Sequence, residues 1–140
     1  MTKPFQNPTG DEIRTLLQEV ETIAVAGLSL KSNRPSNMVT RAMQGFGFRI
    51  VPVRPAVDQV LGEKAYEELS DIPFPVDLVN VFRAAEFIPG IVEECIALKV
   101  PALCVQEGIV HDEACFKARD QGIFTVMDRC IWKEYLAHNL

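Results

Sequence analysis

Residues 22–47 read TIAVAGLSLKSNRPSNMVTRAMQGFG, and the order of residue types in this stretch decides the fold. The apolar run 22–27 ends in glycine, which is typical of a short buried strand. The segment 35–47 starts with Pro35, which the first turn of a helix accepts, and closes on glycines that favour a helix exit. A buried strand, a polar loop and a helix in succession indicate the first half of a parallel βαβ unit.

The same alternation continues along the chain. Continuous apolar runs predict four further strands, at 48–53, 76–82, 101–106 and 123–128. The spacing of apolar residues predicts helices at 35–47, 85–100, 111–122 and 129–140, preceded by a first helix that opens with a Thr9–Glu12 capping box. The segment 60–73 has a mixed composition and predicts an irregular excursion with one helical turn near residues 67–69.

Strands that are apolar throughout, rather than at alternate residues, are typical of a parallel sheet with helices on both faces. We therefore expect an α/β, Rossmann-like, doubly wound fold with five mainly parallel strands, whose order in chain numbering is 3-2-1-4-5. One domain would span 1–140, with 1–20 as an N-terminal extension and helix. Ligands of such sheets bind at the carboxyl ends of the strands, here near a switch point between strands 1 and 4.

Composition narrows the function classes. The net charge of −5 disfavours a general nucleic-acid partner. No apolar run reaches the length of a membrane span, and the first ten residues lack the apolar core of a signal peptide. The four cysteines form no CxxC pair, so we expect reduced thiols, no metal cluster and a cytoplasmic setting.

The loop after the first strand carries residues suited to an anion. Gly27 permits a tight turn and close approach, Ser29 and Ser36 offer hydroxyls, and Arg34 precedes a helix start whose N–H groups favour phosphate. The loop has neither the GxGxxG pattern nor a Walker A lysine. An ordinary capped turn is the alternative interpretation of these residues.

The second strand ends in VPVRP (51–55), where NAD-binding domains usually carry an acidic residue. Arg54 at this point favours a phosphorylated ribose, either the 2′-phosphate of NADP or the 3′-phosphate of coenzyme A. Pro52 and Pro55 would form a rigid wall near an adenine. The alternative is a surface arginine in a proline turn.

The remaining strand ends add polar residues but no catalytic set. Arg83 would contact a ligand or pair with Glu86, and we favour the pairing on the residues alone. Gln106 and Gly108 would line the far side of the crevice, and His111 is interpreted as a polar residue at a helix start.

Six motifs occur in the order seen in a known family: IAVAGLSLKSNRPSNMV, FRIVPVRP, VLGEKAYEELSDIP, VDLVNVFR, QEGIVHDEA and GIFTVMDRC. In these motifs the chain resembles the small stand-alone bacterial CoA-binding proteins. It is also similar to the N-terminal CoA-binding domain of the succinyl-CoA synthetase alpha subunit and of ADP-forming acyl-CoA synthetases. The resemblance covers residues 20–132.

The resemblance implies that coenzyme A lies across the strand ends. Contacts with the pyrophosphate would come from Gly27, Leu28, Ser29, Arg34, Pro35 and Ser36. The adenosine end would be bordered by Val53, Arg54 and Pro55. The crevice and the pantetheine side would be lined by Phe82, Arg83, Gln106, Gly108 and Ile109.

The chain departs from the family pattern at three positions. Arg54 stands where the family usually has asparagine, and it either contacts the 3′-phosphate or folds away. Glu107 replaces an uncharged residue and would add negative charge beside the crevice. His111 stands where asparagine is frequent.

Three functional hypotheses remain open on the sequence. The first is a module that binds CoA or acyl-CoA without catalysis of its own, because the phosphohistidine and nucleotide-binding domains of the synthetases lie outside this domain. The second is an NADP-binding oxidoreductase or regulator. The third is an interaction subunit with a vestigial pocket, working beside a protein partner; the sequence leaves the homo-oligomeric state open.

Overall fold

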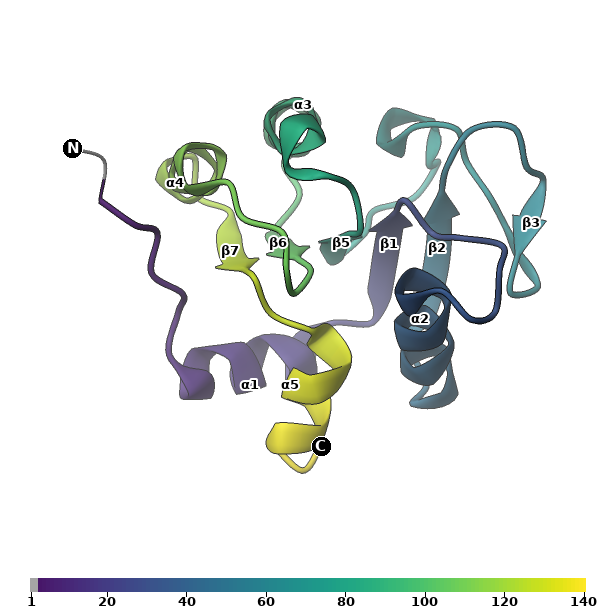
Figure 1. Cartoon of the computed structure of the whole chain (residues 1–140), viewed down its shortest axis with the longest axis horizontal. Helices are drawn as coiled ribbons and strands as arrows, with labels where there is room; N and C mark the ends of the chain where they lie inside the picture. The colour runs from purple at the N-terminus through teal and green to yellow at the C-terminus, as the bar shows by residue number, and fades with distance from the viewer. Residues whose placement is uncertain (1–2) are drawn as a thin grey trace.

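The computed structural model describes residues 3–140 and contains a five-stranded, fully parallel sheet (Figure 1). Its strands, in chain order, are β1 (Thr22–Ala26), β2 (Arg49–Val53), β5 (Leu78–Val81), β6 (Ala102–Val105) and β7 (Phe124–Met127). The strand order across the sheet is β2-β1-β5-β6-β7. The predicted Rossmann-like α/β class and the five predicted strands are confirmed, with bounds that agree to within a few residues.

The predicted strand order 3-2-1-4-5 is wrong in the placement of the third strand. β5 pairs with β1 on one side and with β6 on the other, so the order in the same numbering is 2-1-3-4-5. The outer edge of β2, where the third strand was expected, is occupied by Tyr66. The Tyr66 N–H donates to the Pro52 carbonyl at 2.9 Å, and the Arg54 N–H donates to the Tyr66 carbonyl at 2.8 Å. The switch point therefore lies between β1 and β5.

The connection between β2 and β5 differs from an ordinary crossover helix. It contains a small hairpin, β3 (Gln59–Val60) and β4 (Glu63–Lys64), and a 3₁₀ turn, η1 (Leu69–Asp71). The predicted irregular excursion with one helical turn is thus confirmed, with the turn two residues later than expected. β5 is buried at all four residues, which suits an interior strand rather than an edge.

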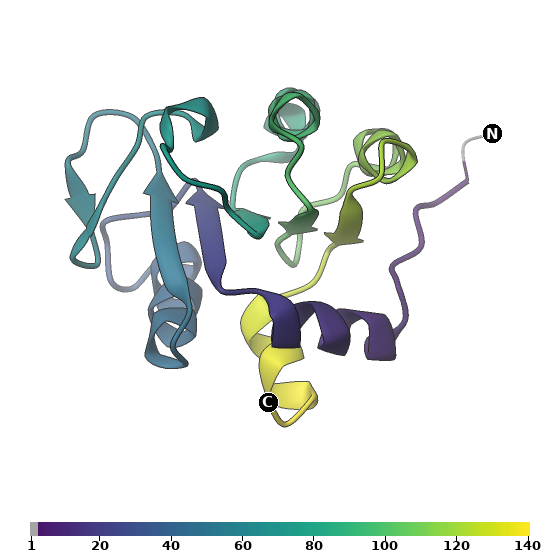
Figure 2. The same cartoon turned by 180° about the vertical axis from the view of Figure 1, so that it is seen from behind.

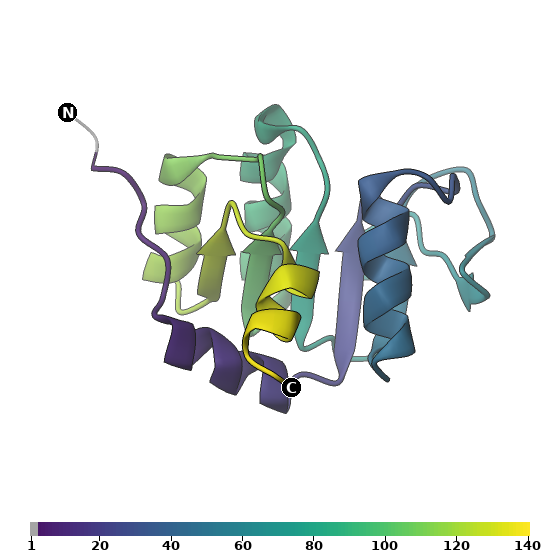
Figure 3. The ribbon, with the colours of Figure 1, turned by 60° about the horizontal axis from the view of Figure 1, so that its bottom comes forward.

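Two layers of helices cover the sheet (Figures 1 and 2). One layer packs α3 (Ile88–Leu98) and α4 (Asp112–Asp120) against one face, with the 3₁₀ turn η2 (Ala85–Phe87) leading into α3. The other face carries α1 (Gly10–Glu19), α2 (Pro35–Gly45) and α5 (Ile131–Ala137). Figure 3 shows α1, α2 and α5 together in front of the sheet. Each face has its own apolar core, as expected for a doubly wound sheet.

Local sequence signals explain where the helices begin. The Thr9 hydroxyl oxygen accepts a hydrogen bond from the Glu12 N–H at 3.2 Å, and the Glu12 carboxylate accepts one from the Thr9 N–H at 3.0 Å, which completes the predicted capping box. Pro35 opens α2, and Arg34 stands at its N-cap without a side-chain capping bond. His111 caps α4, because its Nδ1 accepts the Ala114 N–H at 3.1 Å.

The N-terminal segment covers the outer edge of β7 (Figure 1). The Asn7 side chain bonds twice to the Met127 backbone, with its Nδ2 donating to the carbonyl at 2.8 Å and its Oδ1 accepting from the N–H at 2.7 Å. Phe5 is buried in the core beside α4. This segment satisfies backbone groups that an open edge strand would leave free.

The cysteines behave as core residues. All four are free and buried, and burial raises the pKa of Cys95 and of Cys104 to about 12 and that of Cys115 to about 11. These thiols stay protonated at neutral pH. Among residues 3–140, no helix combines the length and the apolar character that a membrane crossing requires.

Candidate functional site

The carboxyl ends of the strands bring the predicted site residues into one row. Residues 53–55 end β2, 27–29 follow β1, 82–83 follow β5, and 106–109 follow β6. Because the strand order is β2-β1-β5-β6, these four segments lie in this spatial sequence along one edge. In the predicted order, 82–83 would have lain outside 53–55. The corrected order therefore joins the segments into a continuous line.

The loop after β1 is shaped by its own hydrogen bonds. The Ser29 N–H donates to Ser36 Oγ at 2.9 Å, and Asn37 Nδ2 donates to the Ser29 carbonyl at 2.8 Å. Ser29 Oγ accepts the Lys31 N–H at 3.1 Å. These hydrogen bonds hold the loop against the start of α2. The Ser29 N–H is already used, whereas the Ser36 hydroxyl keeps a proton to donate.

The backbone conformation and the packing around residue 27 both require glycine. The φ of Gly27 is +84°, and a Cβ at this position would lie 2.5 Å from the Phe82 carbonyl oxygen and 2.8 Å from Arg83 Cδ. Only glycine tolerates both the dihedral angle and the contact. We expected Gly27 to admit a ligand, but the close approach that the structure shows is between the loops that end β1 and β5.

Arg54 is held at the junction of β1 and β2. Its guanidinium donates to the Leu28 carbonyl at 3.1 Å, while its Nε is buried without a protein partner. The sequence left two alternatives for Arg54, a contact with the 3′-phosphate or a side chain folded back onto the protein. The bond to Leu28 shows that part of the side chain folds back.

A pocket of about 350 Å³ opens where β1, β2 and β5 end. Its apolar wall comes from Ala26, Val53, Leu69 and Ile91, which all pack in the core on the α3 side of the sheet. The start of α2 belongs to the opposite face. The candidate site therefore runs from the α2 face, over the sheet edge, to the α3 face.

Charged residues of both signs line this pocket. The predicted residues Arg54 and Arg83 are joined by three carboxylates that sequence reasoning missed, those of Glu67, Glu68 and Glu94. Glu67 and Glu68 come from the excursion after β2, and Glu94 comes from the inner part of α3. No sequence motif marks these positions. Each of these glutamates has another glutamate beside it in the sequence, so the sequence does not distinguish the one that lines the pocket.

Glu94 differs from the other two carboxylates in its surroundings. Its Oε2 is buried without a protein partner, whereas Glu67 and Glu68 are exposed. Burial raises the pKa of the Glu94 carboxyl above its ordinary value, and the negative charges of Glu68 and Asp71 raise it further. A hydrogen bond from the Leu69 N–H has the opposite effect and lowers this pKa in part.

Arg83 does not form the ion pair that the sequence favoured. Its guanidinium lies 4.2 Å from the centre of the Phe87 ring, a cation–π contact. No salt bridge joins it to Glu86 in the part of the chain that the structure describes. The Phe87 ring instead fixes the arginine beside the pocket.

At the far end of the row, one side-chain oxygen lacks a hydrogen-bond partner, whereas the Gly108 N–H and the Glu107 carboxylate are paired. Gln106 is only 7% exposed, and its Oε1 has no protein partner. The Gly108 N–H donates to Asp128 Oδ1 at 2.7 Å, so it is not free for a ligand. Glu107 forms a salt bridge with Lys133 at 2.9 Å, which offsets the negative charge that we expected it to add.

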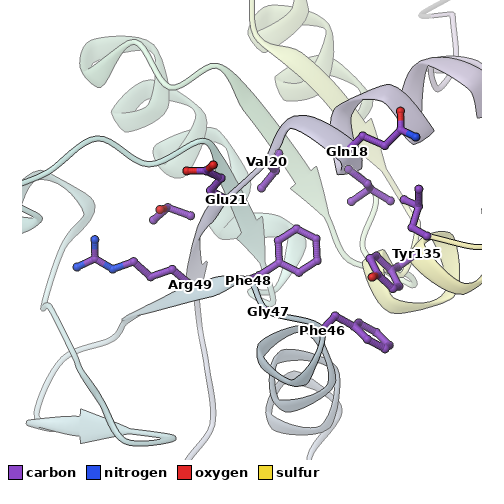
Figure 4. A pocket seen from close by; sticks show the side chains of 11 residues that line it. Gln18, Val20, Glu21, Phe46, Gly47, Phe48, Arg49 and Tyr135 are labelled. Atoms are coloured by element: carbon purple, nitrogen blue, oxygen red, sulfur yellow. The ribbon is translucent and has the colours of Figure 1, made fainter.

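A larger hollow lies at the opposite end of the sheet, where the strands begin (Figure 4). Its volume is about 630 Å³, and its lining includes Glu21, Phe46, Phe48, Arg49 and Tyr135. Figure 4 shows the aromatic rings grouped on one side of it. None of the residues predicted for the site lines this hollow.

The strand order, the two helical layers and the polar loops at the carboxyl ends define a Rossmann-like α/β protein. Residues 21–135 match a family described as a CoA binding domain, and the chain belongs to this family.

The sequence is also similar to those of two individual proteins. The chain is 44% identical over 127 residues to the uncharacterized protein YneT of Bacillus subtilis, covering 91% of this chain and 94% of that one. It is 35% identical over 77 residues to an ADP-forming acetate–CoA ligase of Archaeoglobus fulgidus. That match covers 54% of this chain but only 11% of the ligase.

Among solved structures, a hypothetical protein from Pyrococcus horikoshii OT3 has a TM-score of 0.92 and 29% identity. The similarity covers 100% of this chain and 99% of that one, so the two share the fold over their whole length.

Proposed function

We propose that the chain binds coenzyme A or an acyl-CoA across the carboxyl ends of β2, β1, β5 and β6. The observation that carries the proposal is the spatial sequence of the strand-end segments, together with membership of the CoA-binding family. CoA is a linear ligand of adenosine, pyrophosphate and pantetheine. Its three parts match, in order, three stretches of the row.

The pyrophosphate is assigned to the loop before α2. The residues proposed for it are Gly27, Leu28, Ser29, Arg34, Pro35 and Ser36. Arg34 is exposed and makes no capping bond, so its guanidinium is available to a phosphate, and α2 directs the positive end of its dipole to the same place. Lys31, also exposed, adds a second cation.

The other two parts of the ligand extend to either side of this loop. The adenosine end is assigned to Val53, Arg54 and Pro55 at the 350 Å³ pocket. The pantetheine arm would pass Phe82 and Arg83 and reach Gln106, Gly108 and Ile109. Gln106 is 7% exposed, and its Oε1 has no protein partner. The proposal includes no chemical step.

Titration calorimetry tests this proposal. CoA and acetyl-CoA should bind with one site per chain, whereas absence of binding at millimolar CoA would overturn the proposal. NADPH as a parallel ligand separates the CoA assignment from the NADP alternative, since tighter binding of NADPH than of CoA would favour the latter.

The Arg34→Ala variant tests the pyrophosphate assignment. Loss of one charge-assisted phosphate contact should weaken CoA binding by roughly tenfold. Arg41→Ala is the matched control, because Arg41 is also exposed and lies on the same helix but away from its N-terminus. Equal affinities of the two variants would contradict the assignment of the loop.

A further inference from the structure

A groove between α3 and α4 lies at the same end of the sheet as the candidate site but contains none of the residues assigned to that site. The two helices lie side by side on one face of the sheet (Figures 1 and 2). They follow β5 and β6, so both begin at the carboxyl ends of the parallel strands. The groove has a volume of about 280 Å³ and runs along the first two turns of each helix.

The inner wall of this groove is apolar. Val92 of α3 and Ala114 of α4 line it and are buried, and Pro89 adds apolar surface at the start of α3. His111 also lines the groove, and its Nδ1 accepts the Ala114 N–H at 3.1 Å, as a neutral imidazole does. The inner part of the groove is therefore suited to an apolar chain.

The groove continues the row of strand-end segments. Ile109, the last residue proposed for the pantetheine arm, is two residues before His111, so their Cα atoms lie at most roughly 7 Å apart. Two exposed apolar side chains stand at the same place, one before each helix. Phe87 is 45% exposed two residues before Pro89, and Val110 is 47% exposed directly before His111. Apolar side chains exposed beside a hollow favour an apolar ligand group there.

The charged residues of the groove disfavour an acidic ligand group. Lys117 of α4 forms a salt bridge with Glu93 of α3, and Glu113 is a second carboxylate in the lining. Among the described residues that line the groove, Lys117 is the one permanent cation, and it is already paired. Two carboxylates against one ammonium leave the lining with an excess of negative charge, which repels an incoming carboxylate.

We infer that this groove holds the acyl chain of a CoA thioester and selects uncharged chains over acyl groups that end in a carboxylate. The inference rests on the proposed function and adds to it the class of acyl group and the residues that select it. The thioester stays intact, because the inference includes no chemical step.

Titration calorimetry of the wild-type chain with acetyl-CoA, hexanoyl-CoA and succinyl-CoA tests the selection. A fully buried methylene strengthens binding by about fourfold. The outer side of the groove is open to solvent at Glu93 and Lys117, so the gain per methylene is smaller here. Hexanoyl-CoA should bind roughly tenfold more tightly than acetyl-CoA. Succinyl-CoA should bind no more tightly than acetyl-CoA.

The Glu93→Gln variant tests whether the charges of the groove set this preference. The substitution releases Lys117 to pair with the terminal carboxylate of succinyl-CoA, whose affinity should rise by roughly threefold. The affinity for hexanoyl-CoA should stay unchanged. Glu19→Gln is the matched control, because Glu19 is an exposed glutamate of α1, which covers the opposite face of the sheet.

The outcomes separate the two proposals. Failure of all three thioesters and of CoA to bind overturns the proposed function and this inference together. Equal affinities for acetyl-CoA and hexanoyl-CoA overturn the inference alone, as does an equal response of Glu93→Gln and Glu19→Gln to succinyl-CoA. Heteronuclear NMR supplies the location: the amide signals of Val92 and Ala114 should differ between the hexanoyl-CoA and acetyl-CoA complexes. Identical signals at both residues would show that the chain lies elsewhere and would also overturn the inference.

Discussion

The two ends of the parallel sheet differ in which polar groups are already paired. At the amino end, Asp77 Oδ2 accepts the N–H groups of Glu21 and Thr22 at 3.0 and 2.9 Å. The Arg49 N–H donates to the Glu21 carbonyl at 2.8 Å. At the carboxyl end, Arg54 Nε has no partner within the protein.

The hollow at the amino end is nevertheless the larger one, about 630 Å³ against about 350 Å³. Its aromatic rings pack on each other, with Phe46 and Tyr135 stacked at 4.1 Å between ring centres. Volume alone would therefore have indicated the amino end, whose hollow is lined by none of the residues proposed for the site. Unpaired hydrogen-bonding groups and free cations are the better guide to where a polar ligand binds.

The largest expected effect separates two glycines, one at each end. Gly27→Ala should lower the free energy of unfolding by about 3 kcal/mol, because its φ of +84° and the Phe82 carbonyl 2.5 Å from the added Cβ both oppose a side chain. Gly47→Ala, at the amino end, has a φ of +103° but open space around its Cβ. It should lose only about 1 kcal/mol. Equal losses in urea denaturation would contradict this account of Gly27.

A smaller effect is expected from the amino end. Asp77→Ala leaves the N–H groups of Glu21 and Thr22 without their acceptor and should cost about 1–2 kcal/mol of unfolding free energy. The affinity for CoA should stay within about twofold of the wild type. Asp58→Ala serves as the control, since Asp58 is an exposed aspartate outside the five-stranded sheet. A large loss of CoA affinity in Asp77→Ala would show that the two ends are not functionally separate.

The smallest expected effect concerns the pH dependence of stability. The pKa of Glu94 is raised in the folded state, so its stabilising contribution is present below the ordinary carboxyl pKa of 4.5 and is lost as pH rises through the folded value. Glu94→Gln should therefore be more stable than the wild type at pH 7, by less than about 1 kcal/mol once solvent screening is allowed for. Thermal unfolding between pH 4 and 7 measures the difference.

Glu12 provides the opposite case. The Thr9 backbone and hydroxyl lower the pKa of the Glu12 carboxyl, so its contribution is present above the ordinary pKa and is lost as pH falls. Glu12→Gln should therefore be less stable than the wild type at neutral pH, and this difference should shrink as the pH is lowered. The same sign of pH dependence in both variants would contradict the surroundings assigned to Glu94.

The sequence predicted the elements of the fold well but not the placement of one strand. The Thr9 capping box, Pro35 and the apolar runs are local signals, and each lies where the structure has a helix start or a strand. The run 76–82 has the same apolar character whether it is central or at an edge. The structure places it between β1 and β6, while the Tyr66 backbone occupies the outer edge of β2. No apolar pattern marks Tyr66.

The candidate site was predictable where it follows strand ends. The structure brings the predicted segments 27–29, 53–55, 82–83 and 106–109 to one edge, as the rule for parallel sheets requires. Glu94 was not predictable, because α3 carries two consecutive glutamates and only the packing of α3 decides which of them is turned to the pocket. The partners of Arg54, Arg83 and Glu107 likewise depend on tertiary contacts.

Chemical-shift mapping by heteronuclear NMR tests the central claim most directly. Addition of CoA should shift the backbone amide signals of 27–36, 53–55, 82–83 and 106–109 and leave those of 46–49 and Tyr135 in place. Shifts confined to 46–49 and Tyr135, or no shifts at millimolar CoA, would contradict the assignment of the ligand to the carboxyl ends of the strands.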